Sequence, residues 1–228
     1  IPIMFFNNTI SRDGRKFVLC TKPVRFFMAE HNKTNNNQPT ADIIDFNSFF
    51  RKQNSNNIGV LSALRMNATF PYVLPNVWLP TTPVIDVMDA GLRDNYGQEN
   101  TLIFIDIFKD WLKANTSKVV IIKIRDRSVN DWDESNKNKS LFNVFTKPAF
   151  LLQYNWYKLQ DYYQQDQLDY MKESYGNDLE YVNFQYVPSA KDKEASLSFH
   201  LTTAEKKEIK KAVTNKVNVD ELNKLKTE

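Results

Sequence analysis

The sequence is short of the residues on which many catalytic motifs are built. Its 228 residues include five glycines, two histidines and one cysteine. The glycines stand at positions 14, 59, 91, 97 and 176, so no two of them are four positions apart. This spacing excludes a Gly-x-Ser-x-Gly nucleophile elbow, a Walker P-loop and a dinucleotide-binding Gly-x-Gly-x-x-Gly motif within these residues.

Histidine and cysteine are too scarce for the usual metal or triad chemistry. His31 and His200 stand in contexts that are not typical of the base of a Ser-His-Asp triad, and we interpret both as structural. Together with Cys20 they provide no zinc-ligand spacing, so we expect no metal and no cofactor. Cys20 lies in an apolar run and has no second cysteine to pair with, which favours a buried small side chain.

No sign of charge dominates, and long apolar runs are missing. The 30 basic and 27 acidic residues leave a net charge of +3, which argues against a nucleic-acid partner. No stretch approaches the roughly 20 apolar residues that span a bilayer. The first residues, Ile1 to Phe6, are not typical of a signal peptide. The sequence does not begin with an initiator methionine, which suggests a piece of a longer protein or removal of a leader. The compartment stays open; the Asn- and Lys-rich composition favours a bacterial protein, cytoplasmic or peripheral to a membrane.

What is present is ordinary globular composition with mixed helix and strand signals. Hydrophobic residues make up 42% and charged residues 25%, and the length suits one α/β core. A turn at Asp13-Gly14 predicts an opening hairpin, and Thr202 with Glu205 forms a capping box before a solvated terminal helix. Strands are predicted over 3–6, 16–21, 84–88, 119–122 and 180–187, and helices over 58–68, 101–114 and 142–175. The succession of strand, helix and strand between 84 and 122 predicts a βαβ unit. The helix over 142–175 is crowded with aromatic residues, which favours packing in a core or groove over contact with a membrane or acyl chain.

Asp89 is the strongest candidate for a chemical role. It directly follows the predicted strand over 84–88 and precedes Ala90-Gly91. Functional side chains of open α/β sheets gather where strands end, because the strand ends converge on one crevice. A carboxylate that merely caps a turn would have the same surroundings in sequence, and Asp86 and Asp94 are rivals on the same evidence.

The stretch from Ala63 to Gly97 resembles the second signature block of patatin-like phospholipases. In that family an Arg, small residues and a Pro precede a Pro-containing loop, after which a strand delivers Asp-Gly-Gly or Asp-Gly-Ala, followed by an Asn. The residues that fit this order are Arg65, Ala68, Pro71, Pro75, Asp89, Gly91 and Asn95. The departures are Asn67, where Ser is common, Ala90, where Gly is usual, and Gly97, where Pro often stands. The segment from Ser198 to Thr202 also resembles the tails of bacterial patatin-like proteins.

The resemblance implies a fold and a division of the chain. The expected fold is part of a patatin-type three-layer α/β sandwich with a mostly parallel central sheet, followed by a helical C-terminal region. Residues 1–140 would form the C-terminal half of the catalytic domain, and residues 141–228 a mostly helical extension packed on it. The expected sheet is incomplete, and an N-terminal segment would supply its missing edge.

The resemblance also implies a lipid acyl hydrolase that uses a Ser-Asp dyad without histidine. Asp89 would be the catalytic base, while Arg65, Pro71, Ala90, Gly91 and Asn95 would support its loop. The nucleophilic serine and the oxyanion loop would lie in a preceding segment of the same protein, so these residues alone are expected to be inactive. The implied partners are a lipid or ester substrate and that segment, with peripheral membrane contact. The alternative is a non-catalytic lipid- or acyl-chain-binding module on the same scaffold.

Overall fold

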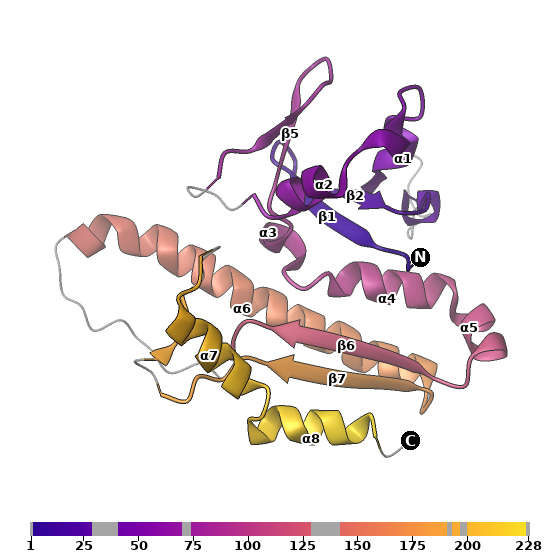
Figure 1. Cartoon of the computed structure of the whole chain (residues 1–228). Helices are drawn as coiled ribbons and strands as arrows, with labels where there is room; N and C mark the ends of the chain where they lie inside the picture. Colours follow the sequence, from indigo (N-terminus) through magenta and orange to yellow (C-terminus); the bar gives the residue numbers. More distant parts are fainter. Residues whose placement is uncertain are drawn as a thin grey trace. The chain divides into compact units, whose positions relative to one another are not determined.

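The described part of the chain forms two compact units. The computed structural model describes residues 2–28, 41–69, 74–128, 142–190, 193–196 and 200–226, without the side chains of residues 56 and 142–155. The first unit comprises residues 1–107 and 153–167, and the second comprises residues 108–152 and 168–228. The long helix α6 (Phe142–Tyr175) therefore belongs to both units (Figure 1).

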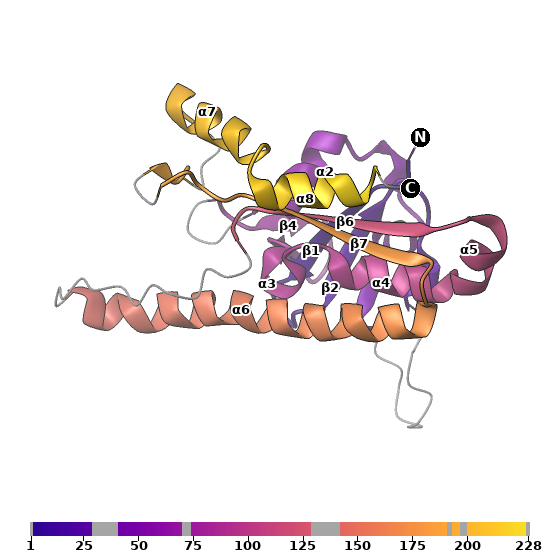
Figure 2. The ribbon, with the colours of Figure 1, turned by 90° about the horizontal axis from the view of Figure 1, so that it is seen from below.

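A two-stranded parallel sheet is the centre of the second unit. Strands β6 (Val119–Arg125) and β7 (Leu179–Gln185) pair along their whole length. Parallel strands need a long crossover, and here the crossover contains α6, which has the predicted bounds. The last part of α6 runs along one face of the sheet (Figures 1 and 2). The strand-helix-strand unit of this protein therefore lies here, in the C-terminal half of the chain.

The two edges of this sheet differ. Helix α8 (Lys216–Lys224) lies along β7, where the Asn218 side chain exchanges two hydrogen bonds with the Gln185 backbone and Glu221 accepts one from Asn183 N. On β6, Val119 and Arg125 direct their backbone groups to β7, so the backbone N–H and C=O groups of the alternate residues point to the other edge. In the described part of the chain no strand or helix pairs with that edge. The side chains of Val120, Ile122 and Ile124 project from one face of the sheet and are exposed by 38%, 52% and 76%, whereas the alternate Ile121, Lys123 and Arg125 are buried on the other face.

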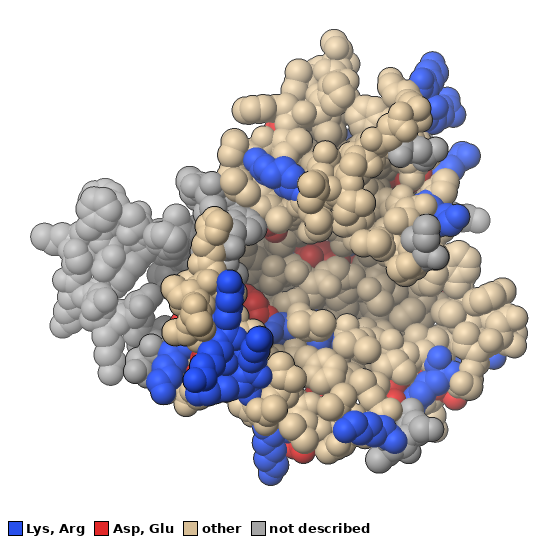
Figure 3. Space-filling view, in the orientation of Figure 1, with Lys and Arg blue, Asp and Glu red and all other residues tan. Residues whose placement is uncertain are grey.

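The predicted terminal helix is two helices. Helix α7 (Thr203–Ala212) begins with the predicted capping box, in which Thr202 Oγ1 accepts a hydrogen bond from Glu205 N and Glu205 Oε2 accepts one from Thr202 N. The backbone N–H of Asn215 donates to Ala212 O, and Asn215 then caps α8. Lysine side chains gather over α7 (Figure 3).

The first unit is built on a five-stranded mixed sheet. The strand order is β3-β2-β1-β5-β4. Their bounds are Phe5–Ile10 for β1, Lys16–Cys20 for β2, Ile43–Asp45 for β3, Val77–Leu79 for β4 and Ile85–Met88 for β5. Strands β1 and β2 form the predicted hairpin, in which Gly14 has a φ of 75° and donates to Ile10 O.

The expectation of a mostly parallel sheet is wrong for these five strands. Only β2 and β3 are parallel, whereas β5 pairs antiparallel with both β1 and β4. Residues 80–84 are too short a link between β4 and β5 for a parallel crossover, so the two strands pair antiparallel. The predicted βαβ unit between 84 and 122 is also wrong, because β5 and β6 belong to different sheets.

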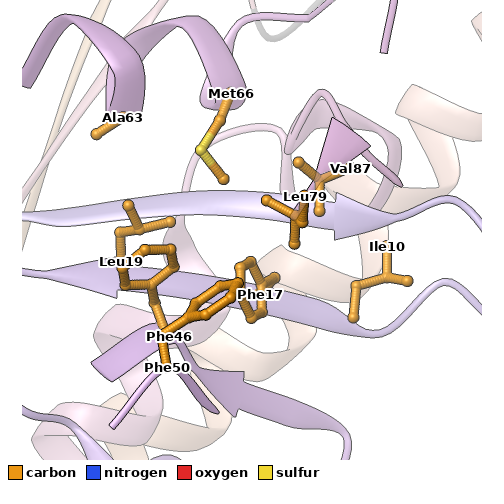
Figure 4. Packing of buried hydrophobic residues seen from close by; sticks show 9 residues of the cluster. All are labelled: Ile10, Phe17, Leu19, Phe46, Phe50, Ala63, Met66, Leu79 and Val87. Carbon is orange, nitrogen blue, oxygen red and sulfur yellow. The ribbon is translucent and has the colours of Figure 1, made fainter. Parts of the chain in front are cut away.

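The core of the first unit is packed around Phe17 on β2. Its ring makes edge-to-face contacts with Phe46 and Phe50, and the cluster continues to the side chains shown in Figure 4. Helix α1 (Phe46–Phe49) is capped by Asp45, which accepts hydrogen bonds from Asn47 N and Ser48 N. Helix α2 (Val60–Asn67) buries Ala63 and Met66, while Leu61 and Leu64 are exposed.

The remaining helices lead from β5 to the second unit. Helix α3 (Gly91–Asp94) directly follows the Asp89 turn, and α4 (Gln98–Ile107) comes next. The predicted helix over 101–114 is interrupted at Phe108, where α5 (Lys109–Asn115) begins. The first unit also contains two short 3₁₀ helices, η1 (Arg25–Met28) and η2 (Ser55–Asn57).

Candidate functional site

Asp89 directly follows a partly buried strand. Val87 on β5 is fully buried, and β5 ends at Met88. Three hydrogen bonds fix the backbone of the turn: Thr9 Oγ1 donates to Asp89 O (3.0 Å), Asp89 N to Thr69 O (3.1 Å), and Ala90 N to Asn67 O (3.3 Å). The turn is thus held between β1 and the C-terminal end of α2.

The carboxylate of Asp89 is half-buried and has one fixed oxygen. Gly91 N donates a hydrogen bond of 2.6 Å to Asp89 Oδ1. No described residue donates a hydrogen bond to the second oxygen, Oδ2. Burial raises the pKa of Asp89 above the ordinary 3.8, and the hydrogen bond from Gly91 N partly offsets this effect. Oδ2 is therefore the oxygen that could accept a proton from a reacting group.

Gly91 leaves space in this turn for the side chains of Asp89 and Asn95. A Cβ atom at position 91 would lie 2.9 Å from Asp89 Oδ1 and 2.7 Å from Asn95 Oδ1. Both side chains therefore converge on the space that the glycine leaves open. Ala90 has a φ of −62°, which any L-residue adopts, so its methyl group is compatible with the turn.

The two rival aspartates are engaged elsewhere. Asp86 Oδ2 accepts a hydrogen bond of 2.6 Å from Asn76, and hydrogen bonds from Asn76 and Ser11 lower the pKa of Asp86. Asp94 is buried and forms an ion pair with Lys16 at 3.0 Å. Its carboxylate also accepts bonds from the backbone N–H groups of Gln98 and Glu99 and from the side chain of Gln164. Among the three, Asp89 is the one whose carboxylate accepts no hydrogen bond from a side chain in the described part of the chain.

Of the residues expected to support the loop, Arg65 contacts both sides of it, whereas the Asn95 backbone contacts α6. Arg65 Nη2 donates to Pro75 O (2.8 Å) and Arg65 Nη1 to Thr69 Oγ1 (2.5 Å), so it links α2 to both sides of the loop. Asn95 N donates to Gln160 Oε1 (3.1 Å). Pro71 and His31 lie outside the described residues. His200 is exposed and belongs to the second unit, whereas Asp89 belongs to the first.

Helix α6 holds α3 in place. Gln160 Nε2 donates to the carbonyl oxygens of Gly91 and Leu92, both at 3.0 Å, and Trp156 Nε1 donates to Leu92 O (2.5 Å). The first turn after Asp89 is therefore fixed by side chains about 70 positions further along the chain. This contact was not predicted, because the interpretation of the helix over 142–175 depended on its aromatic residues and not on its glutamines.

A buried polar cluster lies beneath the α3–α4 connection. Lys16 Nζ lies 2.6 Å from Glu99 Oε2, 3.0 Å from Asp94 Oδ2 and 3.1 Å from Asn100 Oδ1, and its side chain is 1% exposed. Asn100 Nδ2 in turn donates to Asn7 Oδ1 on β1. Breaking such a buried ion pair by removing one partner costs about 3–5 kcal/mol, so the cluster fixes α3 and α4 against the sheet. In the sequence, the adjacent Asn7 and Asn8 in an otherwise apolar strand could have indicated this buried polar cluster.

Two further features bear on cofactors and membranes. Among the described residues there is no group of three or more His, Cys, Asp or Glu side chains placed to hold a metal ion. Within the same residues, no helix combines the length and apolar character needed to cross a bilayer.

Comparisons with known proteins leave the family open. No protein-family model matches the chain, and searches of curated proteins and of solved structures found no significant match. The geometry of the Asp89 turn is therefore the evidence on which a function rests.

Proposed function

We propose that this chain supplies the catalytic aspartate of a patatin-like lipid acyl hydrolase, a Ser-Asp enzyme acting on carboxylic esters. The observation that carries the proposal is the Asp89 carboxylate. It lies just after the partly buried strand β5, with one oxygen held by Gly91 N and the other without a partner among the described residues. Asp86 and Asp94 are the rival candidates from nearby positions, but their carboxylates form structural contacts with Asn76 and Lys16.

The proposed chemistry is general-base catalysis followed by general-acid catalysis. Asp89 Oδ2 accepts the proton of a serine hydroxyl while the serine oxygen attacks the ester carbonyl carbon. The proton then passes to the departing alcohol, and the carbonyl double bond re-forms in an acyl-serine ester. Water, deprotonated by Asp89, hydrolyses that ester. A pKa raised by burial makes Asp89 a stronger base than an exposed carboxylate.

The serine is proposed to come from a segment outside these 228 residues. The glycine spacing leaves no Gly-x-Ser-x-Gly motif in this sequence. The β6 edge, which no described residue pairs with, is consistent with an additional strand, because a two-stranded sheet is marginal on its own.

The alternative is a lipid-binding module without catalysis. The observation that favours it is the exposed aromatic surface of α6, where Trp156, Tyr162 and Tyr163 are each at least half exposed. Such side chains suit contact with an acyl chain or a lipid surface. The two candidates differ in whether Asp89 matters for turnover.

The test is hydrolysis of p-nitrophenyl esters of graded chain length by the full-length protein. We expect Asp89→Asn to lower kcat/KM about 10²–10⁴-fold, because a positioned general base contributes that much. Asp86→Asn is the matched control, since Asp86 lies three positions away and is held by Asn76. The 228-residue chain alone is expected to be inactive.

Two results would contradict the proposal. Full activity of Asp89→Asn would show that Asp89 is not the base. A full-length protein that hydrolyses no ester of any chain length but binds fatty acid would favour the lipid-binding module.

A further inference from the structure

Helix α7 combines exposed lysines with exposed apolar side chains. Lys206, Lys207, Lys210 and Lys211 are all exposed, and at their i, i+4 spacing they form two adjacent rows on one side of the helix. Ile209 and Val213 lie beside these rows and are 36% and 67% exposed. We call these six residues the α7 surface; its lysines are part of the basic cluster visible in Figure 3.

The acidic residues of α7 are turned away from this surface. Glu208 is buried and accepts a hydrogen bond of 2.6 Å from Ser189 N. Glu205 accepts hydrogen bonds from Ser196 and Thr202, which lower the pKa of Glu205 to about 2. One lysine, Lys211, lies 3.8 Å from Glu208 and is partly neutralised. The α7 surface is therefore positive although the helix contains two glutamates.

We infer that the α7 surface docks onto an anionic lipid bilayer. Each Lys near an anionic membrane strengthens binding about fivefold, so Lys206, Lys207 and Lys210 together favour peripheral attachment, and Lys211 adds less. Ile209 and Val213 would enter the boundary between head groups and acyl chains, as the apolar residues of interfacial helices do. Exposed apolar side chains among the lysines favour a bilayer over a nucleic acid, whose phosphate backbone offers them no apolar contact.

The inference adds a membrane contact to the proposed function but does not depend on it. Docking is measured by binding alone, without any ester hydrolysis, and the Asp89→Asn variant is expected to dock as the wild type does. Failure to dock therefore leaves the role of Asp89 untouched, and loss of activity in Asp89→Asn leaves docking untouched.

The test is co-sedimentation of the chain with vesicles. We expect binding to vesicles of phosphatidylcholine with about 30% phosphatidylglycerol to be at least tenfold tighter than to pure phosphatidylcholine, and to weaken when salt rises from 0.05 to 0.5 M. Lys206→Glu/Lys210→Glu should weaken it at least about tenfold. Lys22→Glu/Lys52→Glu, which changes the same net charge at exposed sites elsewhere, should bind as the wild type does.

A third variant tests the apolar part of the surface. Val213→Ser should weaken binding about threefold or more while leaving the salt dependence unchanged, because it removes apolar contact and no charge. All substituted side chains are exposed, so each variant should keep the circular dichroism spectrum of the wild type. Three results would overturn the inference: equal loss in the control double variant, equal binding to pure phosphatidylcholine, or equally tight binding of duplex DNA at the same salt.

Discussion

At position 91 the carboxylate of Asp89 and any side chain would compete for the same space. We expect Gly91→Ala to displace the Asp89 and Asn95 side chains, because its Cβ would lie under 3 Å from both Oδ1 atoms. Both atoms are ends of flexible side chains, so the stability cost is only about 1–2 kcal/mol. Misplacing the base should lower the ester hydrolysis of the full-length protein about 10²-fold.

The pH dependence of the same variant separates positioning from stability. The hydrogen bond from Gly91 N lowers the pKa of Asp89, so its loss should shift the acidic limb of the pH–rate profile to higher pH. Gly59→Ala is the matched control, because a Cβ there would meet only Ser62 Oγ at 4.0 Å. Unchanged activity and an unchanged acidic limb in Gly91→Ala would show that catalysis does not need the carboxylate where the turn holds it.

The burial of Lys16 could not be predicted from the sequence. A lysine at the start of a strand is typical of the surface, yet Lys16 is buried because Asp94, Glu99 and Asn100 arrive from α3 and α4. Asp89, by contrast, was a candidate from its place after an apolar strand, and its role as base is what the resemblance implies. The sequence could not distinguish it from Asp86 and Asp94, since their hydrogen-bond partners come from distant segments.

At the scale of elements, the N-terminal cap of α7 couples stability to pH. The hydrogen bonds from Ser196 and Thr202 hold the pKa of Glu205 at about 2, below the ordinary 4.5. A carboxylate with a depressed folded-state pKa stabilises the folded protein above its unfolded pKa, and this stabilisation is lost as pH falls through the folded value. Glu205→Gln should therefore be less stable than the wild type at pH 7, and the difference should shrink between pH 4.5 and 2.

Urea unfolding at several pH values, followed by circular dichroism, measures this difference. Glu173→Gln is the control: Glu173 is exposed on α6 and forms no hydrogen bond or ion pair with a described residue. It should track the wild type at every pH. A gap between wild type and Glu205→Gln that is constant from pH 7 to pH 2 would mean that the cap does not hold the carboxylate in its charged form.

Local signals predicted elements well and strand partners poorly. The capping box, the Asp13-Gly14 turn and the bounds of α6 depend on neighbours within a few positions, and all three were predicted correctly. The direction of β5 was wrong, because strand pairing is decided by segments far apart in sequence. The same reason explains why β6 and β7 were predicted as strands but not as partners.

At the scale of the whole molecule, the β6 edge is the surface that most needs a partner. Helix α8 closes the β7 edge through Asn218 and Glu221, while the β6 edge is unpaired in the described part of the chain and its strand exposes Val120, Ile122 and Ile124 on one face. Natural proteins avoid such edges, because they pair with other chains. If the serine-bearing segment of the proposed enzyme adds a strand here, the edge is covered only when that segment is present.

This arrangement predicts self-association of the 228-residue chain through β6. Light scattering after size-exclusion chromatography should show dimers or larger species at about 10–100 µM. Ile124→Lys should keep the chain monomeric, because a charge on an edge strand blocks edge-to-edge pairing. Leu61→Lys is the control: it removes an apolar side chain that is 82% exposed on α2 but leaves the edge intact, so it should associate as the wild type does. Under the proposed function, a form of the protein that includes the serine-bearing segment should be monomeric at the same concentrations. A wild-type chain that stays monomeric, or equal dissociation by both substitutions, would show that β6 is not the surface that pairs.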